Sequence, residues 1–148
     1  MKRILFVCSG NTCRSPLAKE LSHHKASDVI ESKSAGLYAA PGVPLSPGST
    51  EVLKERGITS DHTSQPISQE LVDWADIVLT MTRSHRNHAK QLYPEMEDKI
   101  FTLIEYATKG EEDKDIQDPF GGPVEVYRKT AEEIDAYLQM IIDREKEE

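Results

Sequence analysis

The first apolar run of the chain is the feature that most limits how it can fold. Residues 4–7 are Ile, Leu, Phe and Val, with no polar residue among them. A strand with one solvated face would alternate polar and apolar residues, so this run predicts a central strand covered on both sides. A parallel sheet with helices on both faces meets that requirement.

Strand-like and helix-like segments alternate along the rest of the chain. Further strands are predicted at 29–35, 77–81 and 100–104. Helices are predicted at 15–27, from 47 up to Gly57, at 68–74, at 82–93 and at 123–144. This order predicts a three-layer α/β sandwich with a parallel sheet, formed by one domain over residues 1–148.

Charge and length exclude several classes of function. The chain has 26 acidic and 18 basic residues, a formal net charge of −8, which disfavours general attraction to nucleic acid or to an anionic membrane. No apolar run approaches the roughly 20 residues of a membrane span. We therefore expect a cytoplasmic protein with neither partner. The 2 cysteines share one short segment without histidine, so neither a disulfide framework nor a zinc site is expected.

The loop after the first strand carries the strongest chemical signal. Cys8 ends the strand, Arg14 stands where the next helix begins, and the residues between them are Ser9, Gly10, Asn11, Thr12 and Cys13. Their backbone amides can surround an anion, and the helix N-terminus and the guanidinium add positive charge. A thiol in that field ionises more readily than a free one. The loop therefore predicts a thiolate nucleophile facing a tetrahedral oxyanion.

Two features of this loop bear on the alternatives. Gly10 and Asn11 tolerate the backbone conformations that a loop folded around an anion needs. A lone cysteine at a strand end is more often a small buried apolar residue, but that role requires none of the neighbours seen here. The loop also lacks the G-K-[S/T] of a nucleotide-binding Walker loop.

The chain resembles the low-molecular-weight protein tyrosine phosphatase family over nearly its whole length. The motifs are C-S-G-N-T-C-R-S-P at 8–16, S-A-G at 34–36 and D-P-F-G-G at 118–122. The resemblance implies a four-stranded parallel sheet of flavodoxin-like topology. It also implies a phosphocysteine intermediate, inorganic phosphate as product, and no metal or cofactor.

The resemblance also implies a role for each main residue. Cys8 would attack phosphorus, while Arg14 and the loop amides would stabilise the equatorial oxygens. Asp118 would donate the proton to the leaving group and later activate water. The alternative for Asp118 is a turn residue before Pro119.

Supporting roles follow from the same resemblance. Ser15 would donate a hydrogen bond to the Cys8 thiolate, or serve only as a helix cap. Asn11 would be held by Ser34 and His62, although His62 could equally be a surface histidine. Cys13 would pair reversibly with Cys8 on oxidation, or remain a plain buried thiol.

Two positions bear on the substrate. Tyrosine-specific members usually carry an apolar residue where this chain has Thr12, and two aromatics where it has Phe120 followed by glycines. Both departures resemble the protein-arginine phosphatase branch, which acts on phosphorylated proteins. Phosphoarginine needs acceptors for its guanidinium N–H groups, and Thr12 and Asp118 would provide them while Phe120 stacks on the guanidinium plane.

Other functions stay open at this stage. One is a tyrosine phosphatase of the same family, and another is a flavodoxin-like module that binds phosphate without catalysis. An arsenate reductase would need further cysteines after Cys13, and none occurs. An interaction module built on the last helix has no apolar patch to support it.

Tyr127 is expected to border the cleft. A basic stretch is expected to form a solvated helix face, or to guide acidic phosphoproteins; it comprises Arg83, His85, Arg86, His88 and Lys90.

Overall fold

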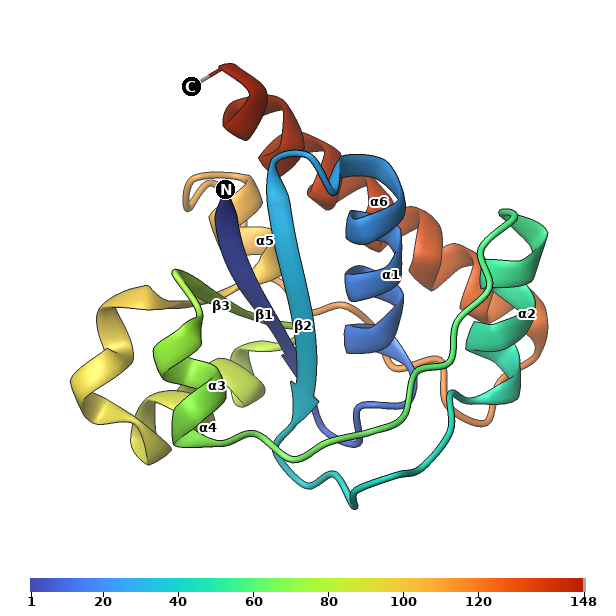
Figure 1. Ribbon diagram of the computed structural model, residues 1–148, viewed down its shortest axis with the longest axis horizontal. Helices are drawn as coiled ribbons and strands as arrows, with labels where there is room; N and C mark the ends of the chain where they lie inside the picture. The colour runs from blue at the N-terminus through green and yellow to red at the C-terminus, as the bar shows by residue number, and fades with distance from the viewer. Residues whose placement is uncertain (148) are drawn as a thin grey trace.

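Strands and helices alternate along the chain in the computed structural model, which describes residues 1–147 (Figure 1). The elements are β1 (Lys2–Cys8), α1 (Arg14–Ala26), β2 (Ile30–Gly36), α2 (Pro47–Glu55), α3 (Gln69–Trp74), β3 (Ile77–Thr80), α4 (Arg83–Leu92), the 3-10 helix η1 (Pro94–Lys99), β4 (Ile100–Thr102), α5 (Leu103–Ala107) and α6 (Val124–Glu147).

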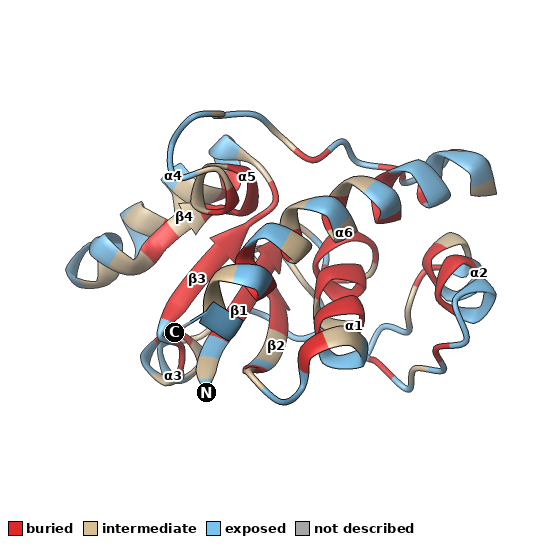
Figure 2. Ribbon diagram, turned by 90° about the horizontal axis from the view of Figure 1, so that it is seen from above, coloured by how far each residue is buried: buried red, intermediate tan, exposed pale blue. Residues whose placement is uncertain are grey.

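The four strands form one parallel sheet in the order β2-β1-β3-β4. Alternate residues of β1 point to opposite faces, so Ile4 and Phe6 join a core with α1, α2, α5 and α6. Leu5 and Val7 join a second core with α3 and α4. Figure 2 shows β3 buried along its whole length and β1 buried beyond its first residues. The predicted layers and the parallel sheet are confirmed.

The strand order places a crevice beside the first loop. The chain runs from β1 outward to β2 and then crosses to β3 and β4 on the other side of β1. In open parallel sheets, ligands bind at the carboxyl ends of the strands where the order reverses. Cys8 is the last residue of β1. The fold therefore places the loop that follows Cys8 at the position where such sheets bind ligands.

The predicted bounds of the second and third strands differ from the structure by one residue, and the fourth strand differs more. The predicted strand at 100–104 ends at Thr102, because Thr102 begins α5 with a capping box. Its hydroxyl accepts from the Glu105 backbone N–H, and the Glu105 carboxylate accepts from the Thr102 N–H. Leu103 and Ile104 are thus helical, and their apolar character reflects burial rather than a strand.

The closing helix α6 packs its apolar positions onto the core. Ile134, Leu138 and Ile141 are fully buried, while its other side carries charged residues. Within residues 1–147, no helix combines the length and the apolar character needed to cross a membrane.

Candidate active site

The predicted nucleophile lies under the first turn of α1. Cys8 is 3% exposed, and its sulfur lies 2.9 Å from the hydroxyl of Ser15. Cys13, the N-cap residue of α1, makes no side-chain hydrogen bond to the first N–H groups of the helix, so its side chain does not satisfy them. Those amides and the helix dipole favour an anion beside the sulfur. The 2.9 Å distance shows that the predicted contact between Ser15 and Cys8 is present.

Asn11 fixes the shape of the loop from its centre. Its backbone is left-handed, with φ of 58°, and the residue is fully buried. The side chain donates to the Ser15 hydroxyl over 2.8 Å and accepts from the Gln65 backbone N–H over 3.0 Å. His62 Nε2 lies 2.8 Å from the Asn11 carbonyl oxygen. Burial lowers the pKa of His62, so its neutral ring donates to that carbonyl. His62 is thus a loop contact, as predicted.

The predicted contact between Ser34 and Asn11 is absent. Among the residues that the structure describes, the Ser34 hydroxyl has no hydrogen-bond partner. Gln65 takes its place, because its backbone N–H binds Asn11 and its side-chain amide donates to the Ser34 carbonyl over 2.9 Å. The sequence did not indicate this role, because any residue type offers a backbone N–H.

The glycine that the loop requires is Gly36, at the end of β2. A Cβ at Gly36 would lie 2.5 Å from the Ser9 carbonyl oxygen and 3.0 Å from the Asn11 nitrogen. Gly10, in contrast, does not adopt a positive φ. The prediction that Gly10 supplies backbone freedom is therefore wrong, and the G of the S-A-G motif lets the loop backbone approach the sheet.

Backbone hydrogen bonds attach the segment that carries Asp118 to the sheet, and the Arg14 side chain binds the same segment. The Met81 N–H donates to the Val7 carbonyl, and the Ile116 N–H donates to the Met81 carbonyl over 2.8 Å. Arg14, which is 5% exposed, donates from Nη1 to the Ile116 carbonyl over 2.9 Å. Its Nη2 lies 3.6 Å from Oδ2 of Asp118. Two residues that are distant in sequence are thus brought together at the carboxyl end of the sheet.

The other predicted substrate contacts are open to solvent to different degrees. The Asp118 side chain is 55% exposed, and its Oδ1 accepts from the Phe120 N–H over 3.1 Å. Phe120 is 76% exposed. Thr12 is half-buried, and its hydroxyl lies 3.9 Å from the Cys13 sulfur. Asp118 and Phe120 are thus accessible to a ligand from solvent.

Cys13 is part of the loop, and its side chain packs against the residues below it. Both cysteines are free thiols, and the Cys13 sulfur lies 3.2 Å from the Ser46 hydroxyl and 3.7 Å from the Tyr127 hydroxyl. Tyr127 is buried, and burial together with the Cys13 contact raises its pKa. Its ring fills the space beside Gly48. Tyr127 therefore supports the loop through its contact with the Cys13 side chain.

The basic stretch on α4 is a solvated face only in part, because Arg83 is exposed whereas His85 is buried. Arg86 forms ion pairs with Glu105 and Asp113, and Arg83 pairs with Asp115. His85 is 7% exposed, and its Nε2 lies 2.8 Å from the Ser9 hydroxyl. The sequence held one signal for this burial, which is the spacing of His85 and the apolar Ala89. Residues four apart lie on the same side of a helix, and both are buried in α4.

The buried position of His85 predicts a pH dependence of stability. Burial, with the Arg14 charge, lowers the pKa of His85 from 6.5 to about 4. The unfolded chain therefore takes up a proton at higher pH than the folded one. The contribution of this group to stability is complete above pH 6.5 and is lost as pH falls toward 4, by about 3 kcal/mol.

Urea unfolding, followed by Trp74 fluorescence at pH 7 and pH 4, measures this contribution. Wild type is expected to lose about 3 kcal/mol more than His85→Gln between the two pH values. An equal loss in both proteins would contradict the assignment of a buried, neutral His85.

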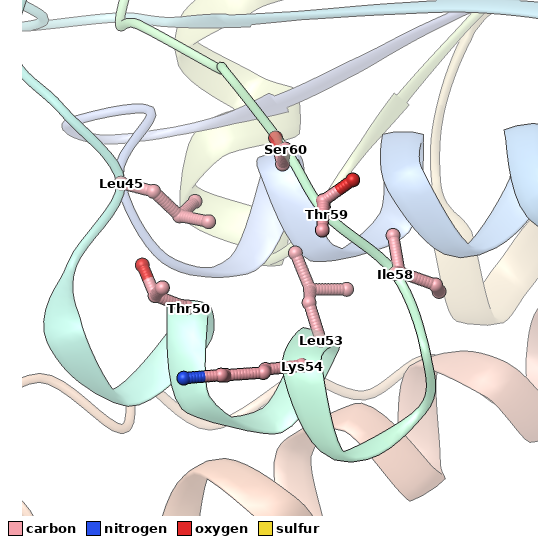
Figure 3. A pocket seen from close by; sticks show the side chains of 7 residues that line it. All are labelled: Leu45, Thr50, Leu53, Lys54, Ile58, Thr59 and Ser60. Carbon is pink, nitrogen blue, oxygen red and sulfur yellow. The ribbon is translucent and has the colours of Figure 1, made fainter.

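A separate hollow lies beside α2. It has a volume of about 260 Å³ and is lined by Leu45, Thr50, Leu53, Lys54, Ile58, Thr59 and Ser60 (Figure 3). None of the predicted site residues lines it. In the described part of the chain, no cluster of three or more His, Cys, Asp or Glu residues could hold a metal ion.

Comparisons with known proteins found relatives over nearly the whole chain. The model of the family described as low molecular weight phosphotyrosine protein phosphatase matches residues 3–148. A protein-arginine-phosphatase of Geobacillus stearothermophilus is 44% identical over 96% of this chain and 95% of its own. A low molecular weight protein tyrosine phosphatase from T. tengcongensis is 43% identical, with a TM-score of 0.91 over 97% of this chain and 99% of its own.

A second similar structure bears on the chemistry. It is a cysteine-to-serine mutant of the YwlE arginine phosphatase with a phosphorylated active-site serine. It is 37% identical to this chain, with a TM-score of 0.93 over 97% of this chain and 95% of its own.

Proposed function

The chain belongs to the low molecular weight phosphotyrosine protein phosphatase family, and we propose that this enzyme is a protein-arginine phosphatase that works through a phosphocysteine intermediate. The observation that carries the proposal is the Thr12 hydroxyl, in a loop that otherwise has Cys8, Ser15 and Arg14 arranged for phosphoryl transfer. Two similar solved structures, both of YwlE arginine phosphatases, support this interpretation.

The first chemical step forms a bond between sulfur and phosphorus. The phosphoryl group of the substrate binds the loop amides and the first turn of α1, where Arg14 stabilises its equatorial oxygens. The Cys8 thiolate attacks phosphorus in line, and the bond from phosphorus to the guanidine nitrogen breaks. Its electron pair stays on that nitrogen, which takes a proton from Asp118. The products of this step are phosphocysteine and an unmodified arginine.

The second step returns the enzyme to its starting state. Water attacks phosphorus while the Asp118 carboxylate takes up one of its protons. The bond between sulfur and phosphorus breaks, inorganic phosphate leaves, and Cys8 departs as a thiolate. Ser15, 2.9 Å from that sulfur, donates a hydrogen bond that stabilises the negative charge.

The leaving group explains the part proposed for Thr12. The guanidinium of arginine has only donors, and its N–H groups need acceptors once they leave water. The Thr12 hydroxyl and the Asp118 carboxylate offer them, and the exposed Phe120 ring can stack on the guanidinium plane. A phenyl ring makes no use of a hydroxyl at this position.

Thr12→Ile is therefore expected to lower kcat/KM for phosphoarginine peptides by roughly 10- to 100-fold, the effect of one hydrogen bond to a charged group. Hydrolysis of phosphotyrosine peptides should be kept or increased. Thr12→Val is the matched control, because it removes only the hydroxyl and keeps the side-chain shape. An unchanged ratio of the two activities in both variants would contradict the role of Thr12.

The alternative is a tyrosine phosphatase, which the similarity to the T. tengcongensis protein favours. Phosphate release from matched phosphoarginine and phosphotyrosine peptides by the wild-type enzyme separates the two functions. A faster rate on phosphotyrosine would establish the alternative. Hydrolysis of neither peptide would instead support a module that binds phosphate without catalysis.

A further inference from the structure

The side chain of Ser9 is held by an element that sequence analysis did not connect with the loop. Ser9 follows Cys8 directly, and its carbonyl accepts from the Tyr38 N–H over 2.9 Å. Its hydroxyl lies 2.8 Å from Nε2 of His85, on α4. The backbone of Ser9 is thus fixed by the turn after β2 and its side chain by α4. The chemistry proposed above leaves His85 without a role.

The surroundings of His85 indicate the direction of this hydrogen bond. The ring is neutral near pH 7, because burial and Arg14 lower its pKa to about 4, so only one ring nitrogen carries a proton. Nδ1 is buried and has no hydrogen-bond partner within residues 1–147. Because buried N–H groups without an acceptor are rare, we assign the proton to Nε2. His85 then donates to Ser9, and the Ser9 proton is free to bind elsewhere.

Ser9 belongs to the loop between Cys8 and Arg14, so the pair of Ser9 and His85 lies beside the residues assigned above to phosphoryl transfer. Four titratable groups act electrostatically on His85. They are Arg14 of α1, Asp115 and Asp118 of the segment before α6, and His88 one turn along α4. Arg14 and Asp118 are the groups assigned above to the phosphoryl oxygens and the leaving group. A phosphoryl group offers only acceptors, so a hydroxyl with a free proton is chemically matched to it.

We propose that His85 is a positioning residue of this site, which orients the Ser9 hydroxyl so that it donates a hydrogen bond to a phosphoryl oxygen held in the loop. The inference rests on the proposed phosphatase function and adds one donor to it. His62 holds the loop at the Asn11 carbonyl, and His85 holds it at the Ser9 side chain. The two neutral histidines thus fix the loop from two different segments.

The test compares His85→Ala, His85→Gln, Ser9→Ala and the Ser9→Ala, His85→Ala double variant. Affinity for inorganic phosphate is measured by titration calorimetry, which does not depend on turnover, and kcat/KM is measured on a phosphoarginine peptide. His23→Ala is the control, because His23 is exposed in the last turn of α1. Thermal unfolding of every variant reports whether the fold is kept.

Loss of the oriented donor should weaken phosphate binding about tenfold in His85→Ala and in Ser9→Ala, with a similar fall in kcat/KM. The double variant should be no weaker than either single one, because both changes remove the same interaction. His85→Gln should stay within about threefold of wild type, because the glutamine Nε2 can donate where the imidazole did. His23→Ala should match wild type.

Two results would overturn the inference. One is wild-type phosphate affinity in a folded His85→Ala variant. The other is an equal loss in His85→Ala and His85→Gln with additive effects of Ser9→Ala, which indicates a purely structural histidine. Neither result touches the proposed function, which fails if the wild-type enzyme hydrolyses phosphotyrosine peptides faster than phosphoarginine peptides, or hydrolyses neither.

Discussion

Replacing Cys8 with serine is expected to lower kcat on every phosphorylated substrate by at least about 10³-fold. A serine hydroxyl stays protonated at neutral pH, and the side chain that contacts this position within residues 1–147 is the Ser15 hydroxyl, which is not a general base. The change should leave the loop in place, because Asn11 is held by Ser15, Gln65 and His62 and not by the sulfur. Phosphate binding should therefore survive while turnover is lost.

Two measurements check this expectation. Phosphate release from a phosphoarginine peptide gives the rate, and intact-protein mass spectrometry detects a phosphoryl group trapped on the new serine. Such a trapped species is seen in the similar YwlE mutant. Cys13→Ser is the matched control, because its side chain contacts Ser46 and Tyr127 under the loop, and its turnover should fall far less. A Cys8→Ser enzyme with near wild-type turnover would exclude a phosphocysteine intermediate.

The sequence predicted the parts of the molecule that are specified locally. The unbroken apolar run at 4–7 is buried on both faces in β1, which required a sheet between two helical layers. The loop that follows could be interpreted because its thiol, its guanidinium and its helix start lie within a few residues of one another. Asn11 was identified for the same reason, because few residues other than glycine adopt its left-handed backbone.

The errors concern contacts that depend on the assembled fold. Ser34 carries the expected hydroxyl, but the bond to Asn11 comes from the Gln65 backbone, which has no residue signature. His85 was assigned to a solvated face because its neighbours are basic. Its burial depends on how α4 packs on the sheet, which places it against Ser9. Gly36 is required because the loop backbone passes over it, and only the fold shows that approach.

Asp118→Asn is expected to reduce hydrolysis of phosphoarginine peptides by about 10²- to 10⁴-fold, the range for loss of a positioned general acid. A guanidine nitrogen cannot leave as an anion, so the bond to phosphorus breaks only when a proton reaches it. Asparagine carries no such proton. It keeps the oxygen that accepts from the Phe120 N–H, so the shape of the segment should be retained.

An aryl phosphate with a good leaving group isolates this proton transfer, because nitrophenolate departs without protonation. With p-nitrophenyl phosphate, Asp118→Asn should release nitrophenol in a rapid burst equal to the enzyme concentration. A slow steady state should follow, because water then lacks its base for the phosphocysteine step. Asp113→Asn, which removes an exposed carboxylate paired with Arg86, is the control and should behave as wild type. If both substrates lose the same factor in the burst phase, Asp118 positions the substrate and is not its proton donor.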